Sequence, residues 1–258
     1  MSDNRPIVVF DSGVGGISVL REMVKLLPNE DFLFFGDSAN APYGTRTLQE
    51  VRELTVGHIR RMVEDGAKAV CIACNTATSA AAEQLRAMYP QMPVIGIEPA
   101  VKPAALSGGK PNVIVMATPM TLREEKFQRL MHRFEGDANI YPLPCPDLVR
   151  FVEKGMLSGE EVEAYLTERF RSLGDVRMDC IVLGCTHFPF VKGAIRRLAG
   201  DGVRLYDGGE GTARQMQRRL RECGIAADEA RTGSVKICNS AGTEEMLALS
   251  QRLLTMEA

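Results

Sequence analysis

Two cysteines stand in short polar motifs of a kind that can move protons. Cys74 opens the motif C-N-T, and Cys185 opens the motif C-T-H. Each follows an apolar run and precedes a stretch with helical character, so we expect both thiols at the carboxyl ends of strands. At Cys74, the positive end of the following helix dipole favours the thiolate, and at Cys185 the nearby His187 is a candidate acid or base.

The two motifs occupy equivalent positions of a diverged internal repeat. With Cys74 aligned on Cys185, 111 residues later, a predicted strand at 7–10 falls opposite one at 113–116. A thiol near a histidine also suggests a nucleophile of the cysteine-hydrolase type, but two facing thiols are redundant for that reaction. Two bases on opposite faces of one carbon can instead remove a proton from one side and return it on the other. The repeat therefore favours inversion of a stereocentre.

Two loops that follow the first two predicted strands can hold a polar ligand. The loop DSGVGG begins at Asp11, and the loop GDSANAPYG begins at Gly36. Neither has the glycine spacing of a nucleotide-binding loop, but backbone amides in such turns can bind a carboxylate. Ser12 would add a hydroxyl group, Asp11 would point toward Cys74, and Tyr43 would offer its hydroxyl to the ligand.

The remaining cysteines are expected to be packing residues or to have no role. The chain has seven cysteines in 258 residues, an odd number in a chain too long to need disulfides, which favours thiols in the reducing cytoplasm. Cys71 and Cys180 align with apolar residues of the other half, and Cys145, Cys223 and Cys238 have no counterpart. The pair formed by Cys71 and Cys74 lacks a second pair at zinc-finger spacing, so we expect no metal site.

Short β-branched runs alternate with amphipathic stretches along the chain, which is the pattern of an α/β fold with parallel sheets. We expect two pseudo-symmetric lobes, each a mostly parallel sheet flanked by helices, with the active site between them. The predicted strands are 7–10, 31–35, 69–73, 93–97, 113–116, 180–183, 203–206 and 235–238. The predicted helices are 17–27, 47–65, 79–88, 122–134, 159–173, 190–198, one from about 210 to 223, and a last one near the C-terminus.

Composition limits the class of partner. The 31 basic and 33 acidic residues leave a formal net charge of −2, so no overall basic field attracts nucleic acid or an anionic membrane. No apolar run approaches the roughly 18 residues needed to span a bilayer. The first predicted strand begins at residue 7, and we expect neither an export signal nor a long regulatory segment ahead of it. The expected ligand is a small molecule.

Five segments together resemble the glutamate racemases of the cofactor-independent aspartate/glutamate racemase superfamily. They are DSGVGG at Asp11, GDSANAPYGTRT at Gly36, ACNTATSAA at Ala73, GIEPAVKPA at Gly96 and LGCTHFPF at Leu183. The resemblance implies a two-lobed cytoplasmic isomerase that interconverts L- and D-glutamate for peptidoglycan synthesis, hence for cell-wall biogenesis and cell shape. It also implies that the enzyme needs neither pyridoxal phosphate nor a metal, and that it is a homodimer.

The resemblance also implies roles for individual residues. Cys74 and Cys185 would be the acid/base pair, with Asp11 assisting Cys74 and His187 assisting Cys185. The substrate would be bound by Asp11, Ser12, Pro42, Tyr43, Gly44, Asn75, Thr76, Thr121, Glu153, Thr186 and His187.

The chain departs from the family pattern in two places. The usual T-x-x-T-x-x-S-x-x-Y is here Thr118, Thr121, Glu124 and Phe127, and the usual D-S-G is Asp207-Gly208-Gly209. The first lies on a predicted helix and the second at a predicted crossing between lobes. We therefore expect effects on packing and lobe movement more than on chemistry.

We expect lobe one to comprise residues 1–98 plus 208–258 and lobe two residues 99–207. The chain would cross between them at Glu98-Pro99 and Asp207-Gly208. Two other functions remain compatible with the sequence: a related racemase that acts on aspartate or another acidic substrate, and a binding or regulatory protein that retains the racemase fold. Intact cysteines at both repeat positions argue against the latter.

Overall fold

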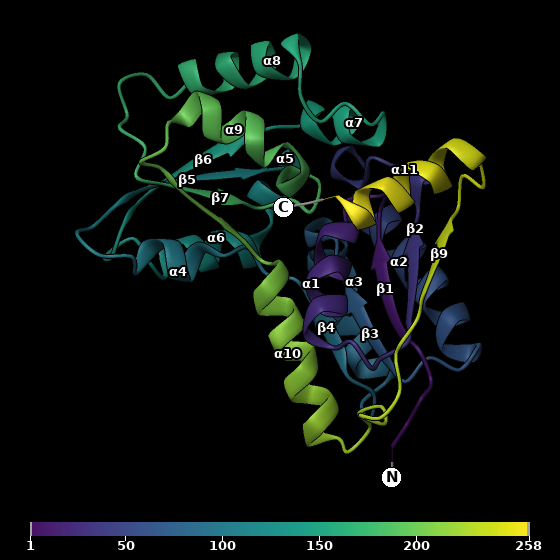
Figure 1. Cartoon of the computed structure of the whole chain (residues 1–258). Helices are drawn as coiled ribbons and strands as arrows, with labels where there is room; N and C mark the ends of the chain where they lie inside the picture. The colour runs from purple at the N-terminus through teal and green to yellow at the C-terminus, as the bar shows by residue number, and fades with distance from the viewer. Residues whose placement is uncertain (1, 257–258) are drawn as a thin grey trace.

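Two β-sheets, each entirely parallel, form the framework of the molecule (Figure 1). The computed structural model describes residues 2–256. The first sheet has the strand order β4-β3-β1-β2-β9, and the second has the order β6-β5-β7-β8. The strands are β1 (Ile7–Asp11), β2 (Phe32–Gly36), β3 (Ala69–Ile72), β4 (Val94–Gly96), β5 (Asn112–Ala117), β6 (Asn139–Pro144), β7 (Cys180–Leu183), β8 (Arg204–Asp207) and β9 (Val235–Asn239).

Helices cover both faces of each sheet (Figure 1). The α-helices are α1 (Ile17–Leu26), α2 (Leu48–Glu64), α3 (Asn75–Met88), α4 (Val101–Ala105), α5 (Pro119–Arg123), α6 (Glu125–His132), α7 (Asp147–Glu153), α8 (Glu160–Arg171), α9 (Lys192–Ala199), α10 (Gly209–Glu222) and α11 (Glu244–Thr255). Three short 3₁₀ turns complete the list: η1 (Ser38–Asn40), η2 (Tyr43–Thr45) and η3 (Phe188–Val191). The predicted α/β class is confirmed.

The strand orders of the two sheets match the internal repeat. Reading from β4, the first sheet runs β4-β3-β1-β2, and reading from β8, the second runs β8-β7-β5-β6. The strands that precede Cys74 and Cys185, β3 and β7, therefore hold the same place in their sheets. The first sheet carries one further strand, β9, which pairs with β2.

Alternating side chains of the central strands pack into different clusters. In β1, Ile7 and Val9 belong to the cluster on the α1 side, whereas Val8 and Phe10 face α2 and α3. This alternation follows from the pleat of a strand, and burial of both faces explains the continuous apolar run of β1. The α1 cluster also includes Ile114 of β5, so one apolar core joins the two sheets.

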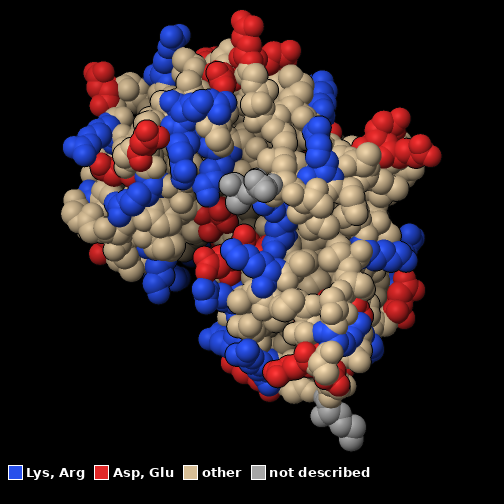
Figure 2. Space-filling view, in the orientation of Figure 1, with Lys and Arg blue, Asp and Glu red and all other residues tan. Residues whose placement is uncertain are grey.

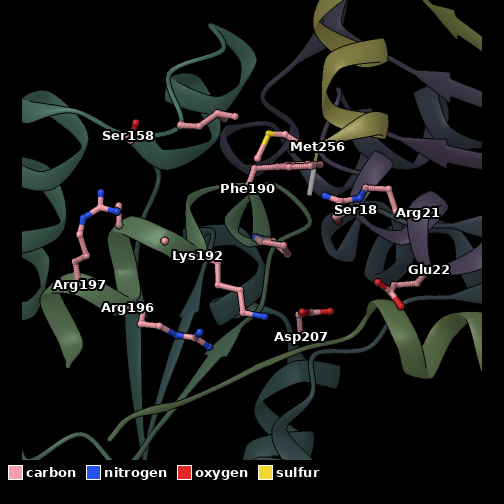
Figure 3. Close-up of a pocket in the computed structure, with 14 residues that line it drawn as sticks. Ser18, Arg21, Glu22, Ser158, Phe190, Lys192, Arg196, Arg197, Asp207 and Met256 are labelled. Atoms are coloured by element: carbon pink, nitrogen blue, oxygen red, sulfur yellow. The ribbon is translucent and has the colours of Figure 1, made fainter. Parts of the chain in front are cut away.

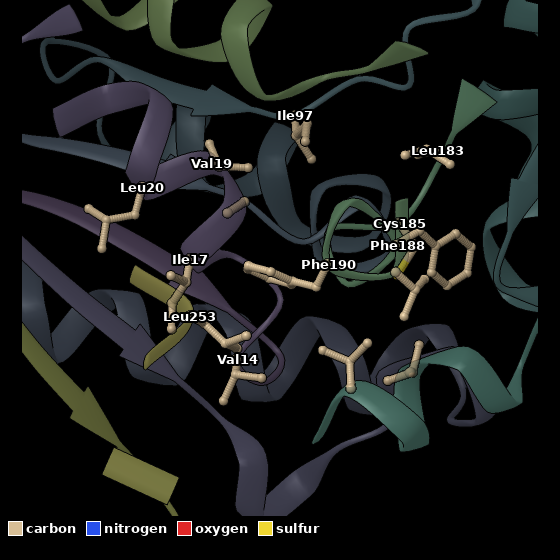
Figure 4. Close-up of a cluster of buried hydrophobic side chains, with 14 of the residues drawn as sticks. Val14, Ile17, Val19, Leu20, Ile97, Leu183, Cys185, Phe188, Phe190 and Leu253 are labelled. Atoms are coloured by element: carbon tan, nitrogen blue, oxygen red, sulfur yellow. The ribbon is translucent and has the colours of Figure 1, made fainter. Parts of the chain in front are cut away.

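The junction between the sheets is filled by apolar side chains from distant segments (Figure 4). Val14 follows β1, Phe190 lies in η3, and Leu253 lies in α11, and all three are buried in the shared core. Because burial of such side chains contributes about 1.5–3 kcal/mol each, this junction stabilises the approach of the two sheets.

Some predicted boundaries were wrong. Helix α3 begins at Asn75, four residues earlier than expected, because the Cys74 thiol accepts a hydrogen bond from Ala77 N and acts as its N-cap. The helix expected over 122–134 is divided into α5 and α6 by the extended backbone of Glu124, whose ψ is 131°. In α6, Phe127, at the position of the family tyrosine, is buried in an apolar cluster.

Two α-helices and one strand were not predicted: α4, α7 and β6. Strand β6 has the sequence NIYPLP and lies at an edge of its sheet. Its two prolines are untypical of a strand, so the sequence pattern did not predict it. Proline is tolerated here because the strand lies at an edge of the sheet.

A buried ion pair anchors the segment between α10 and β9. Lys68 Nζ lies 2.5 Å from Glu30 Oε2, and the side chains of both residues are almost completely buried. Lys68 also donates to Ile225 O at 2.9 Å, and Glu30 Oε1 accepts from Ala227 N at 2.9 Å. These contacts offset the free energy that burying either charge without a partner would cost.

Within residues 2–256, no helix is both long and apolar enough to cross a membrane.

Two glycines of the α10 region should respond oppositely to alanine. A Cβ at Gly208 would lie 2.5 Å from Glu98 O, whereas a Cβ at Gly211 would meet nothing within 4 Å. We expect Gly208→Ala to lower the free energy of unfolding by about 1–3 kcal/mol, because backbone must move apart. Gly211→Ala should raise it by about 0.5–1 kcal/mol. Urea unfolding of both variants measures the contrast, and equal effects would contradict the close approach at Gly208.

Candidate active site

Both cysteine motifs line one cavity at the carboxyl ends of the strands. Cys74 and Cys185 are 6% and 8% exposed, and both reach this cavity. Its volume is about 10 Å³, roughly the room that one water needs, so the site is closed. The lining residues are Ser12, Pro42, Tyr43, Gly44, Cys74, Asn75, Thr76, Thr118, Thr121, Val149, Gly184, Cys185, Thr186 and His187.

Cys74 lies between a helix N-terminus and a buried carboxylate. Its Sγ accepts from Ala77 N at 3.4 Å and lies 3.3 Å from Ser12 Oγ. Burial and the negative charge of Asp11 nevertheless raise the pKa of Cys74 to about 12, against the lowering effect of these two contacts. The helix N-terminus does lower the pKa of Cys74, as expected, but in the closed site desolvation and Asp11 outweigh it and favour the neutral thiol.

Asp11 links the two cysteine motifs from behind the cavity lining. It is fully buried, and its Oδ1 accepts from Gly13 N at 2.9 Å. Its Oδ2 accepts from the hydroxyl group of Thr186 at 2.9 Å, although Thr186 is 175 residues away in the sequence. Burial raises the pKa of Asp11 to about 6, opposed by the charge of His187 and by these hydrogen bonds.

Cys185 faces a histidine and glutamate pair. Its Sγ lies 3.6 Å from His187 Nδ1, and His187 Nε2 lies 2.6 Å from Glu153 Oε1. Burial acts to lower the pKa of His187, but hydrogen bonds to Cys185 and Glu153 outweigh it and raise the pKa well above its usual value. Burial acts to raise the pKa of Glu153, yet its hydrogen bonds and the charge of His187 lower it overall. Both shifts favour a protonated His187 paired with an ionised Glu153.

The hydroxyl group of Tyr43 does not point to the cavity as a free donor. It donates to Asp37 Oδ2 at 2.6 Å, and Asp37 also accepts from Asn40 Nδ2. In this structure the hydroxyl hydrogen of Tyr43 is therefore used by Asp37, and only the phenol oxygen could accept from a ligand. Tyr43 instead lines the cavity beside Pro42 and Gly44, in a turn that its phenol group anchors.

Three threonine hydroxyl groups from both sheets meet at the cavity. Thr76 Oγ1 lies 3.3 Å from that of Thr118 and 3.2 Å from that of Thr121, and the last two are 3.0 Å apart. Thr118 was not among the predicted site residues. It follows β5 as Ser12 follows β1, so the internal repeat would have found it.

Two further lining residues were also missed. Gly184 falls opposite Ala73 in the repeat, whereas Val149 lies in the unpredicted helix α7 and carried no signal in the sequence. Of the predicted site residues, Asp11 and Glu153 do not line the cavity themselves, and they contact lining residues from behind.

Asn75 has an unused hydrogen-bond acceptor. The residue is 6% exposed, and among the described residues its Oδ1 has no partner. A buried polar atom of this kind costs free energy unless it is paired, so it marks a place where a donor is expected to bind.

A larger cavity of about 530 Å³ lies between α1 and α9, away from the cysteines (Figure 3). Lys192 and Arg196 extend into it near Asp207, and Arg21 approaches from α1 (Figure 3). The space-filling view shows basic side chains around the hollow between the sheets, with acidic ones at its floor (Figure 2). Among residues 2–256, no three His, Cys, Asp or Glu side chains are grouped so that they could hold a metal ion.

Comparisons with known proteins place similar sequences and structures among the amino-acid racemases. The family model of the Asp/Glu/hydantoin racemases matches residues 7–216. A glutamate racemase of Clostridium botulinum is 48% identical over 251 residues, which cover 97% of each chain.

Solved structures of glutamate racemases are also similar to this chain. The glutamate racemase of Francisella tularensis, in complex with D-glutamate, has a TM-score of 0.84 at 28% identity, covering 99% of this chain and 95% of that one. The Escherichia coli glutamate racemase, in complex with L-glutamate and the activator UDP-MurNAc-ala, has a TM-score of 0.85 at 29% identity, covering 97% and 95%. This chain belongs to the Asp/Glu/hydantoin racemase family and, within it, to the glutamate racemases.

Proposed function

We propose that this chain interconverts L-glutamate and D-glutamate by moving the Cα proton between the thiols of Cys74 and Cys185. The observation that carries the mechanism is that two buried cysteines, at equivalent positions of the two sheets, line one cavity. One thiolate removes the proton from one face of Cα, and the opposite thiol returns a proton to the other face. The reverse reaction exchanges the two roles.

The closed site supports this chemistry by desolvation. A thiol whose pKa is raised by burial gives a thiolate of greater basicity, which the weakly acidic Cα–H requires. Ionisation of Cys74 then needs a nearby positive charge, which the ammonium group of glutamate would supply. Asn75 Oδ1 is a buried acceptor without a partner among the described residues, and it would receive a hydrogen bond from that ammonium group.

The two thiols would have different helpers. We assign Asp11 to Cys74, because its carboxylate is linked to that thiol through Ser12. We assign His187 to Cys185, because its Nδ1 lies 3.6 Å from the sulfur. The remaining substrate contacts would come from Ser12, Pro42, Tyr43, Gly44, Asn75, Thr76, Thr121, Glu153, Thr186 and His187.

Substrate entry requires the site to open, since a cavity of about 10 Å³ cannot hold glutamate. We propose that the chain divides into lobes of residues 1–98 plus 208–258 and residues 99–207. The lobes would move about the crossings at Glu98-Pro99 and Asp207-Gly208. The close approach of Gly208 to Glu98 O supports this place for the pivot.

We propose a cytoplasmic homodimer that supplies D-glutamate for the bacterial cell wall. No pyridoxal phosphate or metal is part of the proposed mechanism, because both proton transfers are assigned to cysteines. The near-neutral balance of charges, with 31 basic and 33 acidic residues, supports a partner other than nucleic acid or a membrane.

Replacing either thiol should stop racemisation. Cys74→Ser and Cys185→Ser should each lower kcat/KM by about 100- to 10,000-fold or more, because a serine hydroxyl is a far weaker acid than a thiol. Circular dichroism with L-glutamate, and Cα deuterium exchange from both enantiomers, measure the loss. Cys223→Ser, at an exposed cysteine, is the matched control and should keep full activity.

Full activity in either active-site variant would overturn the two-thiol mechanism. L-Aspartate in the same assay tests the related substrate class. Turnover of aspartate at a rate that exceeds that of glutamate would replace the proposed substrate.

The buried carboxyl group of Asp11 should make stability depend on pH. Its pKa of about 6 in the folded protein lies above the ordinary value of 3.8 for an aspartate. Its contribution to stability is therefore present below about pH 4 and is lost as the pH rises through 6. Relative to Asp11→Asn, the wild-type free energy of unfolding should fall by about 2 kcal/mol between pH 4 and 7. Urea unfolding at both pH values measures this difference, and a difference that rises with pH would contradict the assignment.

A further inference from the structure

We infer that Ser38 and Asn239 are positioning residues for the Cys185 half of the reaction, because they hold Glu153 against His187 from the other sheet. This inference rests on the proposed function of Cys185 and His187. Neither residue lines the cavity around the cysteines, and neither was singled out by the sequence analysis.

A continuous chain of hydrogen bonds leads from the thiol to β9. His187 Nε2 meets Glu153 Oε1 at 2.6 Å, on the side of the ring away from Cys185. The other carboxylate oxygen of Glu153, Oε2, accepts from Ser38 Oγ at 2.9 Å. Ser38 Oγ in turn accepts from Asn239 Nδ2 at 2.9 Å.

The direction of these hydrogen bonds is determined by Asn239. Its Oδ1 accepts from Ala241 N at 2.9 Å, so its amide nitrogen must face Ser38. An amide NH₂ group can only donate, and a hydroxyl group has a single hydrogen. The hydrogen of Ser38 is therefore free for Glu153, and Asn239 makes Ser38 a dedicated donor to that carboxylate.

The contact joins the two sheets at the catalytic histidine. Ser38 follows β2 and Asn239 ends β9, both in the first sheet, whereas Glu153 ends α7 beside the second sheet. Val14 N donates to Glu153 Oε1 at 2.7 Å from the same side as Ser38. Glu153 is thus fully ligated only when the first sheet approaches α7, which couples its alignment with His187 to closure of the site.

Charged side chains surround Glu153, and Ser38 is one of the groups that hydrogen-bond to its carboxylate. His187 is the cation that contacts it, and Asp11 is the buried carboxyl group near it. On the outer side it borders a cavity lined also by Lys154, Glu245 and Arg252. The hydrogen bond from Ser38 is one of the contacts that hold the pKa of Glu153 down, so its loss should let Glu153 take up a proton at higher pH.

The first test is the pH profile of Ser38→Ala. We expect kcat/KM at neutral pH to fall about tenfold, the usual size for a hydrogen bond to a charged group, and the acid limb of the pH profile of kcat/KM to move to higher pH.

Asn239→Asp should act in the same direction, because a carboxylate at 239 competes for the hydrogen of Ser38. Ser38→Thr keeps the hydroxyl group and should restore the wild-type limb. Ser172→Ala is the control, since the exposed hydroxyl group of Ser172 donates to Arg169 O in α8 and contacts neither Ser38 nor Glu153.

A second measurement does not depend on activity. In protein labelled with carboxyl-¹³C glutamate, the Glu153 resonance, assigned by its loss in Glu153→Gln, should titrate at higher pH in Ser38→Ala than in wild type. An unchanged titration together with an unchanged acid limb would overturn the role of Ser38. If wild-type protein fails to exchange the Cα proton of glutamate, the proposed function fails instead, and the ¹³C titration still decides whether Ser38 acts on Glu153.

Discussion

The carboxyl group of Asp11, buried without contact with solvent, is the constraint on which the site depends. It ends the central strand of the first sheet and accepts a hydrogen bond from Thr186, which follows Cys185 at the end of the second sheet. A buried carboxyl group needs such partners, because desolvation without them costs several kcal/mol. The two sheets must therefore meet in the register that places both thiols on one cavity.

The site is symmetric in its backbone and asymmetric in its electrostatics. Strands β3 and β7 hold equivalent places and deliver one cysteine each. Around them, the first thiol has a buried carboxyl group and a serine, whereas the second has the imidazole ring of His187, which contacts Glu153. The matching strand orders thus explain why a cysteine from each sheet lines the cavity, whereas the side chains next to the two thiols differ.

Several contacts between the two sheets hold the active-site cavity closed. They include the threonine hydroxyl groups at the cavity, the hydrogen bonds of Glu153 to Val14 and Ser38, and the close approach of Gly208 to Glu98 O. The shared apolar core at Val14 and Phe190 lies between them. All of these contacts are present together, and those around the cavity would have to separate to admit a substrate.

The sequence by itself determined the α/β class, the parallel sheets, the internal repeat and the equivalent positions of Cys74 and Cys185. These features follow from the periodicity of apolar residues and the order of motifs, which are local properties of the chain. The sequence did not reveal strand β6, whose prolines hide it, or the break at Glu124. Only the tertiary structure decided that Tyr43 donates to Asp37, that burial raises the pKa of Cys74, and that Ser38 reaches Glu153. Desolvation and most of these partners depend on segments that are distant in sequence and meet only when the two sheets pack together.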